Sequence, residues 1–169
     1  MAKSVDEITS DAIEDGGYLC LLYFDMHASS EEQVKNIMVG FIAKLTKEPG
    51  VIYALGEIDK PIVHDNLFSS SAEVKLLAHD FVTLTRICSS YAPIGIEILR
   101  PHEPKLTLGD VQEALLSISQ YSQNFTTHIL EKVLSPAEKA EYAKKMQQRS
   151  AIGKSLLERK HEQGKTVQK

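Results

Sequence analysis

The sequence predicts an α+β fold in which a four-stranded antiparallel sheet carries two helices on one face and is followed by a C-terminal helical hairpin. Two patterns support this fold class. Apolar residues alternate between strand spacing and helix spacing across residues 17–101, whereas only helix spacing is found from residue 107 onward. The chain has 169 residues, of which 43% are hydrophobic and 25% are charged, and these values are ordinary for a globular domain.

The first strand and the first helix have the clearest signals. Residues 18–24 are seven consecutive apolar residues, a run that is typical of a strand buried on both faces. Ser30 and Gln33 then form a capping box, which marks the start of a helix. Apolar residues recur at three- and four-residue steps over residues 34–45, so this helix has one apolar side.

Three further strands and a second helix complete the predicted sheet. Residues 51–58 and 72–78 have strand patterns, and residues 59–71 between them predict an unusually long hairpin loop because they hold a proline and several serines. Asp80 is a suitable N-cap for a helix that ends before Pro93. Isoleucines alternate over residues 94–98, which predicts the last strand.

The resulting order of strand, helix, strand, strand, helix and strand resembles the ferredoxin-like superfold. That superfold includes ACT domains, which sense small molecules, and RNA-recognition motifs, so the resemblance implies a binding role of one of these kinds. RNA-recognition motifs stack bases on aromatic residues of their central strands. The predicted third strand, residues 72–78, has no aromatic residue, which disfavours RNA binding on this sheet.

Residues 107–157 predict the helical hairpin. Thr107 precedes a run of apolar residues at three- and four-residue steps that continues to Ile129 and is close to a heptad pattern. Ser135 and Glu138 form a second capping box, which starts a weaker helix.

The dimensions of these elements predict a homodimer or a higher oligomer through the long helix, residues 107–134. A helix of this length measures about 40 Å, whereas strands of seven or eight residues span only about 23–27 Å. Moreover, two helices of this topology cover one face of the sheet, so either Leu19, Leu21 and Tyr23 or the residues on the opposite face of this strand need another cover. The C-terminal hairpin, folded back or donated by a second copy, is the expected cover.

Charge is unevenly distributed along the chain, whose net charge is −4. Residues 1–134 carry 10 Lys/Arg against 19 Asp/Glu, and residues 135–169 carry 9 against 4. We expect an acidic N-terminal segment, 1–16, and a flexible basic tail, 158–169. The basic end either docks on the acidic body of the same or a second copy, or binds nucleic acid. In the nucleic-acid alternative, the phosphate contacts would come from Lys144, Lys145, Arg149, Lys154, Arg159 and Lys160.

One group of polar residues is a candidate site. We expect the carboxyl ends of the first and third strands to lie side by side, which would bring Asp25, His27 and Ser30 close to His79 and Asp80. Two helix N-termini would then point into one space, and such a space suits an anion. Alternatively, the set of His27, His79 and Asp25 would hold a divalent metal. The simpler interpretation is that these residues cap helices and form turns locally.

These observations predict a non-catalytic, oligomeric binding or regulatory protein that senses a small anion or metabolite at the two helix starts. The alternatives are an RNA- or ribosome-associated protein that uses the basic helix and a metal-dependent enzyme. No nucleophile elbow or phosphate-binding glycine loop is found, and we expect no cofactor.

The sequence also predicts a cytoplasmic protein that does not enter a membrane. No apolar run approaches the roughly 18 residues of a membrane span, and the acidic N-terminus does not resemble a signal peptide. Cys20 and Cys88 lie in apolar runs, as reduced, buried thiols do.

Overall fold

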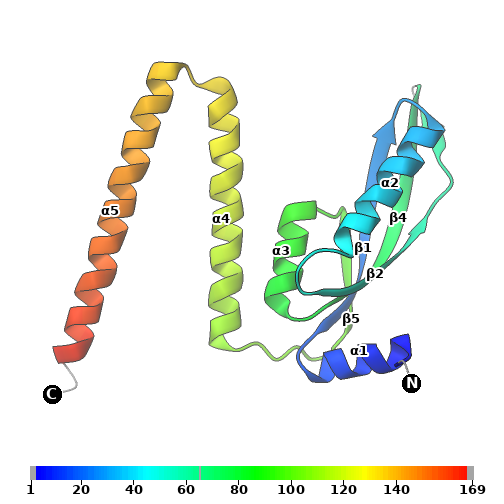
Figure 1. The fold of residues 1–169 in the computed structure, drawn as a ribbon, viewed down its shortest axis with the longest axis horizontal. Coiled ribbons are helices and arrows are strands. Elements are labelled where there is room, and N and C mark those ends of the chain that lie inside the picture. The colour runs from blue at the N-terminus through cyan, green and yellow to red at the C-terminus, as the bar shows by residue number, and fades with distance from the viewer. Residues whose placement is uncertain (1–2, 65, 167–169) are drawn as a thin grey trace. The chain divides into compact units, whose positions relative to one another are not determined.

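The computed structural model describes residues 3–64 and 66–166 (Figure 1). Within these residues it is an α+β structure with one antiparallel sheet of five strands and with five helices, which confirms the predicted fold class. The chain divides into two compact units, residues 1–121 and 122–169. The first unit holds the whole sheet.

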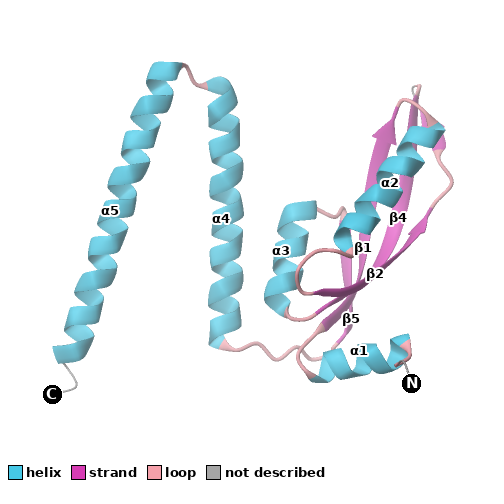
Figure 2. Cartoon of the chain, viewed as in Figure 1, coloured by secondary structure: helices cyan, strands magenta, loops and turns pink. Residues whose placement is uncertain are grey.

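Figure 2 distinguishes the helices from the strands by colour. Their bounds are α1 (Val5–Glu14), β1 (Tyr18–Ala28), α2 (Glu31–Leu45), β2 (Val51–Ile58), β3 (Ile62–His64), β4 (Leu67–Ala78), α3 (Phe81–Tyr91), β5 (Gly95–Arg100), α4 (Leu108–Val133) and α5 (Pro136–Thr166).

The strand order is β2-β4-β1-β5, with β3 also pairing with β4, and every pairing is antiparallel. This order is the one expected when two strand–helix–strand units interleave in a single sheet. β1 and β4 are the central strands, and their ladder runs from Tyr18 opposite Ala78 to Ala28 opposite Phe68.

Alternate residues of β1 build the core on one face of the sheet. Cys20, Leu22 and Phe24 are buried there together with Met38 and Leu45 of α2 and with Leu84 and Ile87 of α3. Burial raises the pKa of the Cys20 thiol to about 12, so this cysteine is a neutral core residue. The predicted helix starts are confirmed, because Ser30 accepts a hydrogen bond from the Gln33 N–H and Asp80 accepts one from the Thr83 N–H.

The prediction of a long loop over residues 59–71 is wrong, because most of these residues lie in strands. β3 and the first three residues of β4 form a second stretch of ladder there, in which Ile62 pairs with Ser69, and β4 includes Ser70 and Ser71 as well. The serines read as turn residues because of their local preferences, but the Ser70 side chain is buried and donates a hydrogen bond to the Asp59 carbonyl. β1 is correspondingly longer than predicted and continues to Ala28.

Helix α1 lies within the segment that the sequence predicted only as acidic. Its N-terminus is a capping box, in which the Ser4 hydroxyl accepts from the Glu7 N–H and the Glu7 carboxylate accepts from the Ser4 N–H. The sequence contains this signal, Ser4 followed three residues later by Glu7, but the prediction did not use it.

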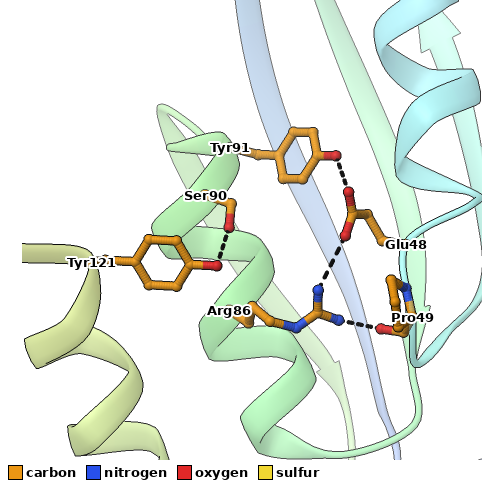
Figure 3. A network of polar contacts seen from close by, with 6 residues as sticks. All are labelled: Glu48, Pro49, Arg86, Ser90, Tyr91 and Tyr121. Carbon is orange, nitrogen blue, oxygen red and sulfur yellow. Dashed lines mark hydrogen bonds and ion pairs between the residues drawn. The ribbon is translucent and has the colours of Figure 1, made fainter. Parts of the chain in front are cut away.

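A polar network in the first unit ties α3 to the turn after α2 (Figure 3). The Glu48 carboxylate accepts hydrogen bonds from the Tyr91 hydroxyl at 2.5 Å and from the Arg86 guanidinium at 3.1 Å, and Arg86 also donates to the Pro49 carbonyl. The Tyr91 hydrogen bond and Arg86 lower the pKa of Glu48 despite its partial burial. Burial and the Glu48 carboxylate raise the pKa of Tyr91 to about 12. Charge and hydrogen bonding together therefore fix this corner of the fold.

The second unit holds the end of α4 and all of α5. Apolar side chains that include Leu130 of α4, Met146 of α5 and Leu134 of the turn between the two helices line a hollow of about 520 Å³. α5 continues to Thr166, beyond residue 157 where the sequence predicted that the hairpin ends. Among the described residues, no helix is both long enough and apolar enough to cross a lipid bilayer.

Candidate functional site

The two halves of the predicted site lie at opposite ends of the sheet, so the shared pocket expected from the sequence does not form. β1 and β4 are antiparallel, with His27 opposite Ser69 and Tyr18 opposite Ala78. At about 3.3 Å per residue, roughly 30 Å of ladder separates His27 from His79. The expectation that the two strands end side by side was wrong, because a hairpin reverses the chain between the second and third strands.

His27 contacts Asp25 and Ser69, and not His79. The His27 Nδ1 atom lies 2.7 Å from the Ser69 hydroxyl, and its Nε2 atom lies 3.3 Å from the Asp25 carboxylate. Serine hydrolases use a serine, an imidazole and a carboxylate in this order. Here the His27 side chain is 55% exposed. These three side chains therefore form an exposed polar cluster near one end of the β1–β4 ladder, and not a buried catalytic triad.

His79, Asp80 and Ser30 act as helix caps or as neighbours of caps. The His79 Nδ1 atom lies 3.3 Å from the Asp80 carboxylate, which caps α3. Burial raises the pKa of Asp80, but hydrogen bonds from Thr83 and His79 outweigh this effect and hold it below its usual range. In the part of the chain that the structure describes, no group of three or more His, Cys, Asp or Glu side chains is placed to hold a metal. The predicted metal site at Asp25, His27 and His79 is therefore wrong.

The basic residues of the nucleic-acid alternative lie on α5. Lys144, Lys145, Arg149 and Lys154 are exposed, and Lys145 forms an ion pair with Glu141 at 2.8 Å. Arg159 and Lys160 lie in the last turns of α5, outside the residues whose side chains the structure describes.

The second face of the sheet, opposite the core, is only partly covered. α1 covers one end of it: Thr9 is buried and shares a hydrogen bond of 2.8 Å with the Tyr53 hydroxyl, and Leu19 and Leu77 are buried on the same rung of the ladder. The cover that the sequence assigned to the C-terminal hairpin is thus provided in part by α1.

The rest of this face, which we call the open face, consists of two rungs that cross all four main strands. One rung places Leu55, Lys75, Leu21 and Glu97 side by side, and the next places Glu57, Glu73, Tyr23 and Gly95 side by side. Leu99 of β5 adds a third leucine. The four charged side chains are exposed, and the leucines and Tyr23 between them are exposed or half-buried.

The open face brings two like charges into direct opposition. Glu57 and Glu73 are register partners on neighbouring strands. Carboxylates in such positions repel each other and lower the stability of a sheet. Desolvation and then the Glu97 and Glu73 carboxylates raise the pKa of Tyr23, so its hydroxyl stays protonated beside this acidic pair. The two rungs of the open face thus carry three carboxylates, those of Glu57, Glu73 and Glu97, and one ammonium group, that of Lys75.

Two adjoining hollows lie on the open face and share Glu57 and Glu73. One, of about 370 Å³, is lined by side chains that include Leu21, Leu55 and Lys75. The other, of about 490 Å³, is lined by residues that include Tyr23. Volumes of this size are those of small-ligand or side-chain pockets. The open face therefore combines apolar surface, an aromatic ring and a negative charge excess in one concave area.

The sequence identified part of this surface. The first strand is apolar on both faces, so the prediction was that either the set with Leu21 and Tyr23 or the opposite set is left bare by the two helices. It did not include Glu57 and Glu73 as site residues. Their opposition depends on the register between β2 and β4, which no local pattern reveals.

Comparison with known proteins gives one match. The model of the MJ0538 family matches residues 19–148, a range that begins in β1 and ends within α5. That description names neither a ligand nor an activity. The searches of curated proteins and of solved structures returned no match.

Proposed function

The chain belongs to the MJ0538 family, and we propose that it is a non-catalytic binding protein whose open face takes a cationic segment of a polypeptide partner. The observation that carries this proposal is the direct opposition of Glu57 and Glu73. The resemblance in element order to ACT domains and RNA-recognition motifs, which also bind ligands, supports a binding role. We further propose that the protein works in the cytoplasm, since Cys20 is a buried, free thiol.

The acidic pair favours a positively charged group in the hollow beside it. Two opposed carboxylates cost folding stability, and a lysine or arginine side chain placed between them would remove their repulsion. The Tyr23 ring borders the same hollow and can add a cation–π contact. Among the described residues no three His, Cys, Asp or Glu side chains are close enough together to hold a metal, so an organic cation fits this hollow better than a metal ion.

The apolar part of the open face favours a polypeptide over a small free cation. Leu21, Leu55 and Leu99 line the hollow next to the acidic pair. Lysine and arginine carry an apolar stem beneath the charge, and neighbouring residues of a peptide would cover the leucines. The negative charge excess of the same face disfavours an anion or a nucleic acid as its ligand.

A peptide-binding experiment tests this function. We expect fluorescence anisotropy to show that the full-length protein binds labelled peptides rich in lysine or arginine, with an affinity that falls as salt rises, and that it does not bind glutamate-rich peptides of equal length. The double variant Glu57→Gln with Glu73→Gln should lose this binding. The matched control is Glu32→Gln, an exposed position on α2, which should retain it. Equal affinity of the double variant and the wild type would contradict the proposal.

A second candidate, nucleic-acid binding, is supported by the exposed basic residues of α5. Neutralising phosphates with several lysines or arginines gives an affinity that falls steeply with salt concentration. The variant Lys144→Gln, Lys145→Gln and Arg149→Gln should then lose RNA binding, whereas Glu57→Gln should not. Absence of RNA binding by the wild type at low salt would exclude this candidate.

A further inference from the structure

Helix α4 carries a stripe of large apolar side chains that nothing in the described chain covers. Six of them leave between 44% and 75% of their surface exposed, and they follow one another at three-, four- or seven-residue steps, so they share one side of the helix. This α4 stripe consists of Leu108, Leu115, Ile118, Phe125, Ile129 and Val133.

The side of α4 that packs within the sheet-containing unit lies directly beside the stripe. Ala114 is buried, and the Tyr121 hydroxyl lies 2.6 Å from the Ser90 hydroxyl of α3. Ile118 and Phe125 lie three or four residues from Tyr121, so these contacts border the stripe and still leave 49% and 69% of the two side chains exposed.

The middle of α4 also lacks charge. Residues 114–130 contain no Asp, Glu, Lys or Arg, although the 25% charged share of the chain would place about four such residues in a segment this long. Exposed helix surfaces normally carry charged residues. Depletion of charge together with enrichment in apolar side chains is the compositional signature of the core of a protein–protein interface.

We infer that two copies of this chain pair through the α4 stripe, with their α4 helices antiparallel and with Ser122 of each copy at the two-fold axis. The apolar positions are nearly symmetric about Ser122: Ile118 and Leu115 precede it by four and seven residues, and Phe125 and Ile129 follow it by three and seven. An antiparallel pair therefore faces Ile118 with Phe125 of the partner subunit. This self-complementarity is the property of a two-fold interface.

Charge favours the antiparallel pair over a parallel one. Residues 1–121 carry 9 Lys/Arg against 18 Asp/Glu, a net charge of −9 for the unit into which the first half of α4 packs. A parallel pair would place two such units at the same end of the helices. An antiparallel pair places them at opposite ends of helices that are about 39 Å long, where salt screens their repulsion.

The area of the stripe is large enough for a stable dimer. At roughly 150 Å² for each large apolar side chain, the six residues of both copies would remove on the order of 1,100 Å² of exposed surface from water. A biological interface is expected to exceed about 1,000 Å² in total.

Measurement of mass in solution tests the pairing. We expect multi-angle light scattering of the full-length protein to give twice 18.8 kDa, and the variant Ile118→Lys with Phe125→Lys to give 18.8 kDa with an unchanged circular dichroism spectrum. The matched control is Leu55→Lys, which changes an equally exposed leucine on the open face and should leave the dimer intact. A monomeric wild type, or a double variant that stays dimeric, would overturn the inference.

Disulfide trapping tests the direction of the helices. In an antiparallel pair, Ile118→Cys and Phe125→Cys chains should form an intermolecular disulfide when they are mixed, and neither should do so alone. Each variant cross-linking to itself would show a parallel pair and would overturn the proposed arrangement. Cross-linking of the wild-type chain, which contains the native Cys20 and Cys88, measures the background of disulfide formation.

Discussion

Replacing Glu57 by glutamine should make the protein more stable, although it removes a residue of the proposed binding face. Glu57 faces Glu73 across the β2–β4 ladder, and both side chains are exposed. Glutamine keeps the size and the hydrogen-bonding capacity of the side chain but removes its charge. The variant therefore isolates the repulsion between the two carboxylates.

The size of this gain follows from the geometry of the ladder. Directly opposed side chains have their Cβ atoms about 5 Å apart, and two unit charges at about 6 Å in water repel by about 0.7 kcal/mol. Lys75 lies two residues from Glu73 on the same face and attracts both carboxylates, which offsets part of the repulsion. We therefore expect a gain of about 0.5 kcal/mol, or a rise in Tm of about 1–2 °C for a chain of this size.

Thermal and urea unfolding at low and high salt measure the gain. The stabilisation should be present at about 10 mM salt and should vanish at about 1 M, where charges are screened over about 3 Å. The control is Glu97→Gln on the same face, because Glu97 is opposite Leu21 and its replacement relieves no direct repulsion. A destabilised Glu57→Gln protein, or a gain that does not depend on salt, would refute the electrostatic reasoning.

Three further predictions test the fold. Tyr91→Phe should cost about 1–2 kcal/mol at neutral pH. The folded pKa of Glu48 is lowered, so its contribution is present above the usual carboxyl value of 4.5 and is lost as pH falls through the lowered value; urea titrations at pH 7 and pH 3 should show this cost shrinking in acid. Gly50→Ala should cost at least about 1–2 kcal/mol in the same assay, because Gly50 has a φ of 80° and an added Cβ would lie 2.5 Å from the Thr83 hydroxyl. Cys20, with a thiol pKa of about 12, should resist iodoacetamide in the native protein and react after unfolding, as mass spectrometry would record.

Local patterns predicted those parts of the fold that local interactions determine. The caps at Ser30 and Asp80 and the apolar spacing of α2 and α3 depend on residues within one or two helical turns. Residues 59–71 were mistaken for a loop because the strand conformation of Ser69 and Ser70 comes from pairing with His27 and Met26, which are more than forty positions away in the sequence. α1 was missed because the acidic composition of residues 1–16 outweighed its capping box.

The prediction of the candidate site was wrong because it assigned the wrong direction to the third strand, and not because it misjudged the chemistry of the residues. A helix that connects the first two strands makes them parallel, and the hairpin that follows reverses the third. The predicted connectivity therefore already required antiparallel central strands, and the pairing of Asp25 and His27 with His79 contradicted it. The opposition of Glu57 and Glu73 depends on register, which is set by the whole β2–β4 ladder and has no local signature.

The open face and the α4 stripe share a physical property that separates them from the rest of the chain. Each contains an exposed residue that another residue type could replace at a gain in stability or solubility. Glutamine in place of Glu57 would not be repelled by Glu73, and a polar residue in place of Phe125, which is 69% exposed, would need no cover. Packing inside one copy explains neither choice, because the core lies on the other face of the sheet and α4 contacts α3 through Tyr121. We propose that a different partner compensates each feature: a cationic polypeptide segment on the acidic open face, and a second copy of the chain on the uncharged α4 stripe.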